Sequence, residues 1–158
     1  MILRYSRPAM RGIWADDNKL KIWLRIELLA SEALVKEGVV PKADFERIKA
    51  GAELCFADLQ GLTERARELE KTLNHDVIAF TTAVAEKINH RASRWLHFGL
   101  TSSDVGDTAL AVQLVESADI LRADLEALRV AIAGRAKEHQ FTPTSLLVRP
   151  KCNQRLAR

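Results

Sequence analysis

The sequence has 158 residues, of which 47% are hydrophobic, so it is long enough to form one domain with a substantial core. Only 6% of the residues are aromatic, and seven glycines and four prolines occur, which favours an all-α fold over a sandwich or barrel rich in turns. The formal net charge is +3, but residues 145–158 hold four basic side chains and no acid, so the body of the chain has no basic excess and we expect no nucleic-acid partner.

The first part of the chain predicts an irregular arm over residues 1–15, which includes one short helix, and two further helices after it. A short helix begins at Pro8, because proline suits the first helical position. The next begins at the cap cluster of residues 16–18 and ends at Gly38. This helix is marked as amphipathic by Leu20, Trp23, Leu24, Glu27, Leu28, Ala30, Ser31 and Leu34. A short helix over about residues 42–50 is predicted to end at Gly51.

Two further helices are predicted before residue 90. A strongly charged helix covers Leu59 to Lys71, with one face in solvent. Residues 72–76 then form a capped helix start. The helix that follows has the apolar residues Val77, Ile78, Phe80, Ala83, Val84 and Ile88. A short helical piece is expected around Trp95 and Leu96.

Residues 97–105 predict the start of a long helix over residues 103–138. Thr101 followed by Asp104 fits the capping-box pattern. An apolar stripe at helical spacing follows, formed by Leu110, Leu114, Ala118, Leu121, Leu125, Leu128 and Ile132. Such a helix would be on the order of 50 Å long, whereas a compact chain of this length is only about 40 Å across. We therefore expect the stripe to lie uncovered unless helices of another subunit or of further sequence cover it.

Other sequence signals exclude several classes of protein. No run of 18 apolar residues occurs, so no membrane span is expected, and a charge at Arg4 argues against a signal peptide. Two cysteines without a motif suggest a reducing compartment, and we expect the cytoplasm. The four histidines form no metal pattern, and the chain has no phosphate-binding glycine loop and no nucleophile elbow.

The residues that could carry chemistry lie at the two capped helix starts and in the arm. Helix starts present backbone amides that can hold a carboxylate or phosphate. His75 beside Asp76 adds an imidazole suited to proton transfer, and Arg4 and Tyr5 add a guanidinium and a phenol. Each feature also has a purely structural interpretation, as a cap or a surface pair. From the residues alone, the chain is a helical protein with anion-binding helix ends.

Several stretches together resemble the amino-terminal part of the adenylosuccinate lyase family, in the fumarase/aspartase superfamily. They are residues 4–8 with Ile13-Trp14, residues 75–80, and residues 97–105 with residues 107–110. The resemblance covers about residues 1–144. It implies a helical domain over 1–100, the first long helix of a bundle over 101–141, and a non-family, disordered tail over 142–158. It also implies a homotetramer assembled through the long helix.

The resemblance implies a reaction in purine nucleotide biosynthesis. The family eliminates fumarate from adenylosuccinate and from succinylaminoimidazole carboxamide ribotide, and it uses no cofactor and no metal. The implied substrate-binding residues are Arg4, Tyr5, His75, Asp76, Thr101 and Ser102. His75 would also support proton transfer, whereas Asp104 would support the helix cap. Asn74 departs from the family, which often has arginine before this histidine.

Two family segments do not occur in these 158 residues. One is a Gly-Arg-Thr/Ser-His stretch that supplies the general-acid histidine, and the other is a Ser-Ser-x-Met-Pro loop that supplies the base serine. We therefore expect a truncated lyase that is inactive alone, with residues 145–158 added by a frameshift or a wrongly assigned gene end. Two alternatives remain open. One is a superfamily lyase that acts on argininosuccinate or fumarate, and the other is a non-catalytic helical module that assembles with full-length lyase subunits or another partner.

Overall fold

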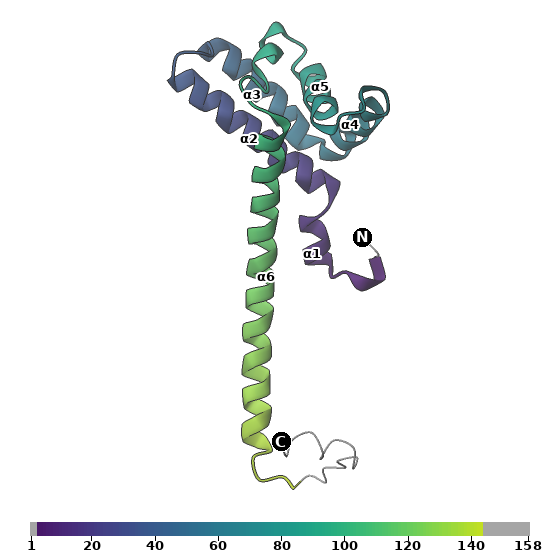
Figure 1. Ribbon diagram of the computed structural model, residues 1–158, viewed down its shortest axis with the longest axis vertical. Coiled ribbons are helices and arrows are strands. Elements are labelled where there is room, and N and C mark those ends of the chain that lie inside the picture. Colours follow the sequence, from purple (N-terminus) through teal and green to yellow (C-terminus); the bar gives the residue numbers. More distant parts are fainter. Residues whose placement is uncertain (1–2, 144–158) are drawn as a thin grey trace, which may run out of the picture. The chain divides into compact units, whose positions relative to one another are not determined.

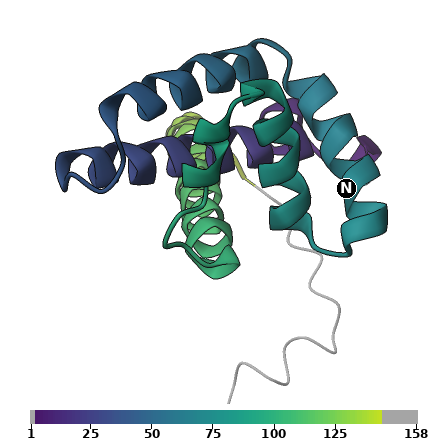
Figure 2. The ribbon, with the colours of Figure 1, turned by 90° about the horizontal axis from the view of Figure 1, so that it is seen from above.

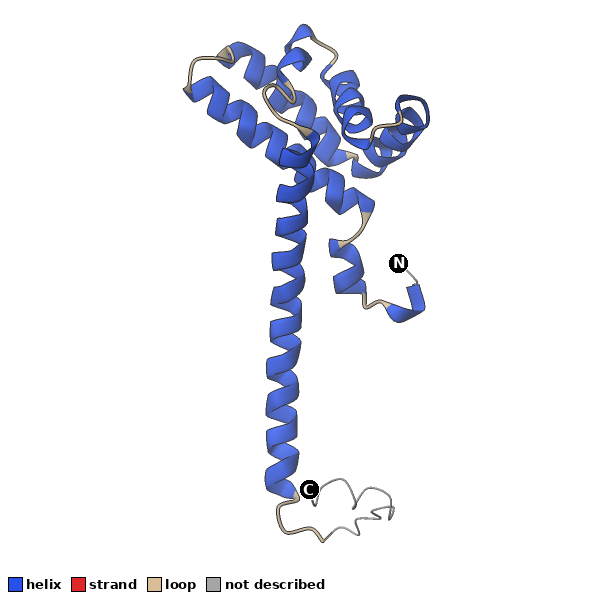
Figure 3. Ribbon diagram, in the orientation of Figure 1, coloured by secondary structure: helices blue, strands red, loops and turns tan. Residues whose placement is uncertain are grey.

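The computed structural model describes residues 3–143, and every regular element within them is helical (Figure 3). This confirms the predicted all-α fold. The elements are η1 (Leu3–Tyr5), α1 (Pro8–Ile13), α2 (Asp16–Lys36), α3 (Lys42–Ala57), α4 (Leu59–Leu73), α5 (Asp76–Ile88), η2 (Arg91–Trp95) and α6 (Ser102–Glu138). Among the described residues, no helix is both long enough and apolar enough to cross a membrane. The predicted tail lies outside them from residue 144 onward.

The chain divides into two compact units, residues 1–120 and residues 121–158. In the first unit, α4 packs along α5, and α3 packs against both α5 and α2 (Figures 1 and 2). The short η2 helix contacts α3 and α5. What is described of the second unit consists of the remainder of α6 and a short turn after it. All of the predicted site residues belong to the first unit.

The core of the first unit lies between α2, α3, α4 and α5. Its largest fully buried side chains include Phe80, Leu24 and Ile48. The ring of Trp23 meets Phe80 edge-on, with the ring centroids 5.5 Å apart. Burial of an apolar side chain of this size contributes roughly 1.5–3 kcal/mol to folding. This core includes Val77 of α5 and Val105 of α6, so it fixes the starts of both helices.

Most predicted helix ends agree with the structure, but one is wrong. Gly38 follows α2 with a φ of +73°, and Asn74 follows α4 with a φ of +53°, so both adopt the left-handed conformation that ends helices. By contrast, the helix predicted over residues 42–50 does not end at Gly51, because α3 continues to Ala57. Gly51 is buried against Ile88 of α5, so this glycine serves close packing and not a helix end.

The long helix α6 begins at Ser102 and ends at Glu138, in agreement with the prediction. Its buried side chains are Val105, Ala109, Gln113 and Ser117, which recur every four residues. The seven residues of the predicted apolar stripe are all exposed. For example, Leu110 is 45% exposed and Leu125 is 65% exposed. The expectation that this chain leaves the stripe uncovered is therefore confirmed.

Candidate functional site

Both side chains of the predicted His75–Asp76 pair cap the start of α5. The Ile78 N–H donates a hydrogen bond of 3.3 Å to Nδ1 of His75. The Val77 N–H donates a hydrogen bond of 2.8 Å to Oδ1 of Asp76. The side chains of His75 and Asp76 are 40% and 51% exposed, so a ligand can reach both. The capped helix start predicted over residues 72–76 is therefore present, but histidine is an unusual cap and the sequence did not single out His75 as the capping residue.

The cap orients the imidazole of His75. Because Nδ1 accepts a hydrogen bond, a neutral imidazole carries its proton on Nε2. Nε2 has no hydrogen-bond partner within residues 3–143. Oδ1 of Asp76 lies 3.8 Å from Nδ1, which is too far for a hydrogen bond. His75 therefore presents one ring nitrogen to a ligand while the other is fixed to the helix.

The start of α6 has two backbone amides available for an anion. The Thr101 N–H donates to Oδ2 of Asp104 at 2.7 Å, which is the acidic half of the predicted capping box. Asp104 thus supports the helix start, as expected. For the amides of Ser102 and Ser103, residues 3–143 provide no acceptor. The helix dipole and these amides favour binding of a carboxylate here.

A buried carboxylate holds the turn that leads into Thr101. The His97 N–H donates to Oε2 of Glu27 at 2.8 Å, and Nδ1 of His97 lies 2.6 Å from Oε1 of the same side chain. Glu27 has no exposed surface. Sequence reasoning counted Glu27 among the residues that mark α2 as amphipathic and assigned it no role. The sequence feature that could have indicated a role for Glu27 is the presence of a charged residue on an otherwise mostly apolar helix face.

The arm that contains Arg4 and Tyr5 is attached to the rest of the first unit through the end of α1. The Ile13 carbonyl accepts a hydrogen bond of 2.7 Å from the Gln113 side chain and one of 2.9 Å from the Asn18 side chain. The Arg4 guanidinium lies over the Tyr5 ring, 4.8 Å from its centroid. Tyr5 is 74% exposed. The phenol and the guanidinium are thus available to a ligand.

The six predicted residues occupy three separate segments of the first unit. Each pair of neighbours stays together: Arg4 with Tyr5, His75 with Asp76, and Thr101 with Ser102. Among the described residues, no hydrogen bond or ion pair joins one pair to another. The structure of this chain therefore shows three exposed parts of a candidate site, each built on a helix start or a short helical turn.

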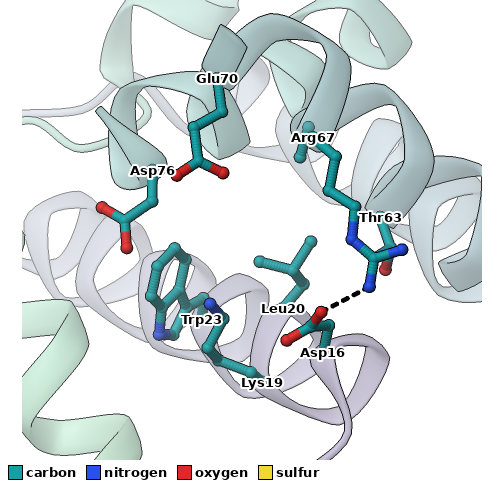
Figure 4. A pocket seen from close by; sticks show the side chains of 9 residues that line it. Asp16, Lys19, Leu20, Trp23, Thr63, Arg67, Glu70 and Asp76 are labelled. Atoms are coloured by element: carbon teal, nitrogen blue, oxygen red, sulfur yellow. Dashed lines mark hydrogen bonds and ion pairs between the residues drawn. The ribbon is translucent and has the colours of Figure 1, made fainter. Parts of the chain in front are cut away.

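A pocket of about 100 Å³ lies beside Asp76, between α2 and α4 (Figure 4). Its lining includes Asp16, Lys19, Trp23, Arg67 and Glu70. The Arg67 guanidinium bonds the Asp16 carboxylate at 2.5 Å and holds the pKa of that carboxyl below its usual value. Lys19 lies over the ring of Trp23 at 4.9 Å. Both basic side chains of the lining, Lys19 and Arg67, already have partners within the chain. The pocket is therefore a poor site for an anionic ligand.

The structure also allows two other kinds of site to be assessed, a metal site and a reactive cysteine. Within residues 3–143, no three histidine, cysteine, aspartate or glutamate side chains gather closely enough to hold a metal ion. Cys55 is fully buried in the core, and burial raises the pKa of its thiol to about 11. Its thiol therefore stays protonated at neutral pH and is a structural group.

Comparison with known proteins identifies the family to which this chain belongs. The sequence model of the family described as "Lyase" matches residues 3–145, which is most of the chain. The chain therefore belongs to this lyase family. It is 45% identical over 142 residues to the adenylosuccinate lyase of Bacillus subtilis (strain 168) and 44% identical over 142 residues to that of Streptococcus mutans.

Each of these matches covers 90% of this chain and 31% of the relative. The chain thus spans about a third of the length of the two lyases. A solved structure has the same fold: the crystal structure of fumarate lyase from Mesorhizobium sp. BNC1 superimposes with a TM-score of 0.75 at 21% sequence identity. That match covers 88% of this chain and 32% of the other. At this identity it supports the fold alone.

Proposed function

We propose that this chain forms the amino-terminal part of an adenylosuccinate lyase. The family membership and the 45% identity to a bacterial adenylosuccinate lyase support this proposal over the other superfamily lyases. The observation that carries it is the start of α6, where the Thr101 hydroxyl and the available amides of Ser102 and Ser103 can receive a carboxylate of a succinyl group.

The substrates we propose are adenylosuccinate and succinylaminoimidazole carboxamide ribotide. In the elimination, a base removes a proton from the succinyl carbon, the C–N bond breaks, and the departing nitrogen takes a proton as fumarate forms. His75 would bind the substrate and support proton transfer through Nε2, with Asp76 beside it. Arg4 and Tyr5 would bind the nucleotide, with the guanidinium at its phosphate.

The proposed enzyme needs further groups and a larger assembly. The general-acid histidine and the base serine of the family lie in stretches that these 158 residues do not contain, so we propose that the chain is inactive alone. The exposed apolar side chains of α6 support assembly with further helices, as in the proposed homotetramer. The cytoplasm is the proposed location.

The exposed stripe of α6 also favours a second candidate function. The chain could act as a non-catalytic module that assembles with full-length lyase subunits. Co-purification of an intact lyase with the tagged chain would support the module. Failure of the chain to bind purified lyase subunits at micromolar concentration would exclude it.

A chimera tests the catalytic proposal directly. Residues 3–143 of this chain replace the aligned segment of the Bacillus subtilis adenylosuccinate lyase, and cleavage of adenylosuccinate is followed by absorbance. We expect the chimera to cleave adenylosuccinate and not argininosuccinate, and the 158-residue chain alone to cleave neither. A folded chimera without activity on adenylosuccinate would overturn the proposed function.

A further inference from the structure

We propose that Glu27 is a positioning residue that fixes the turn of residues 97–100 and thereby sets the place of Thr101 and Ser102. The importance of those two residues rests on the proposed function, whereas the action of Glu27 on the turn rests on the geometry alone. Glu27 lies in α2, and it is separated from His97 by 70 residues of sequence. A change at Glu27 would therefore act on the site through His97 and not through a ligand.

Both oxygens of the Glu27 carboxylate bind the same residue. Oε2 accepts from the His97 N–H at 2.8 Å, and Oε1 lies 2.6 Å from the ring Nδ1. No other residue within 3–143 bonds this carboxylate. The side chain of Glu27 is completely buried, whereas that of His97 is 24% exposed. A buried carboxylate needs such partners because an unpaired one is strongly disfavoured, so the two groups hold each other in place.

The turn needs an external tether. His97 has a φ of +60°, a backbone conformation that residues other than glycine rarely adopt. The hydrogen bonds within this segment are long, at 3.4 Å from the Phe98 N–H to the Trp95 carbonyl and 3.4 Å from the Leu100 N–H to the His97 carbonyl. The two short contacts to Glu27 therefore contribute more to fixing the turn than its own backbone bonds do.

The rest of this segment is held independently of Glu27. Before the turn, the Trp95 indole N–H donates to Asp44 at 2.9 Å. After it, Val105 of α6 is buried in the core. Loss of the Glu27 contacts should therefore loosen the backbone between these two anchors, which includes Thr101 and Ser102, without unfolding the helices on either side.

Nuclear magnetic resonance of the 158-residue chain tests the action of Glu27 on the turn. In Glu27→Gln, the amide has one oxygen and one nitrogen in place of the two carboxylate oxygens, so it cannot accept at both positions from the His97 N–H and the ring Nδ1–H. We expect unchanged helicity, an altered 15N spectrum of the His97 ring, and about tenfold faster hydrogen exchange at the His97 or Thr101 amide, as for loss of a charged hydrogen bond. The matched control is Glu32→Gln on the same helix, where an exposed pair with Lys36 is lost. Unchanged exchange and ring spectra in Glu27→Gln would overturn the proposal.

Kinetics of the chimera test the consequence for the site. Glu27→Gln should raise KM for adenylosuccinate about tenfold while its thermal unfolding midpoint stays near that of the parent chimera. If the Glu27→Gln chimera has the same KM and the same kcat as the parent chimera, the positioning role is overturned. If the parent chimera is inactive, the proposed function fails while the magnetic resonance result still decides whether Glu27 fixes the turn. If Glu27→Gln loses helicity, Glu27→Asp, which keeps the charge but is too short to reach both donors, decides by the same measurements.

Discussion

Gly51 of α3 lies directly against Ile88 of α5. A Cβ atom built on Gly51 would lie 2.6 Å from Cγ1 of Ile88 and 2.8 Å from its Cα. Real Cβ atoms do not approach other atoms so closely, and the backbone of Ile88 cannot move aside as a flexible side chain can. The absence of a side chain at Gly51 therefore sets how closely α3 and α5 can pack.

The Gly51→Ala substitution should destabilise the first unit. Because the added methyl group would force α3 and α5 apart, we expect the free energy of unfolding to fall by about 1–3 kcal/mol. Urea unfolding followed by circular dichroism measures this change. Gly106→Ala in α6 is the control, since no atom lies within 4 Å of its added Cβ and alanine favours helix. An equal effect of the two substitutions would show that the packing at Ile88 has no special cost.

The buried thiol of Cys55 should make stability depend on alkaline pH. The thiol has an ordinary pKa of 9.0 in the unfolded chain, and burial raises it to about 11 in the folded one. The folded state therefore binds more protons between these values. The resulting stability is fully present below pH 9 and is lost as the pH rises toward about 11.

Thiol chemistry checks this account of Cys55. In a Cys152→Ser background, a thiol reagent at neutral pH should react with Cys55 only after unfolding in denaturant. Substitution of Cys55 by alanine should remove the part of the unfolding free energy that declines between pH 9 and 11. Rapid labelling of the native chain would contradict the burial of this thiol.

Asn74 should be replaceable by glycine but not by the arginine that often precedes the histidine in this family. The residue has a φ of +53° at the end of α4, which asparagine and glycine tolerate better than longer side chains do. We expect Asn74→Arg to lower the free energy of unfolding by about 1 kcal/mol and Asn74→Gly to leave it nearly unchanged. If both variants unfold at the same urea concentration, the left-handed conformation does not explain the asparagine.

Gln113 should hold the arm that carries Arg4 and Tyr5. Gln113→Ala removes one of the two donors to the Ile13 carbonyl, while Asn18 still satisfies that acceptor, so the expected loss is only about 1 kcal/mol. The loss should appear as faster tryptic cleavage at Arg11 in α1. Gln60→Ala is a suitable control, because Gln60 bonds only Glu64 on an exposed surface. Cleavage at the parent rate would show that the arm is held by other contacts.

The features that could be predicted from the sequence are those set by local chemistry. The start and end of α6 follow from the cap at Thr101–Asp104 and from an uninterrupted helical pattern, and Gly38 ends α2 as expected. The apolar stripe of α6 could also be predicted, because apolar residues at helical spacing are recognised from the sequence without knowledge of tertiary contacts.

The features that could not be predicted depend on contacts between distant segments. Gly51 has the same local signature whether it ends a helix or allows two helices to touch, and only Ile88 distinguishes the two. Glu27 is paired with a residue 70 positions away, so neither residue alone indicates the pair. The capping role of His75 was missed because histidine is not among the usual capping residues.

The most direct test of the central claim is the kinetics of His75→Asn in the chimera with the Bacillus subtilis enzyme. Asparagine can replace the cap that His75 makes to Ile78, but it cannot transfer a proton. The proposed role predicts a fall in kcat for adenylosuccinate cleavage of about 10²–10⁴-fold at an unchanged thermal unfolding midpoint. Full activity in the asparagine variant would contradict the claim that His75 takes part in the elimination and would leave it only the role of a helix cap.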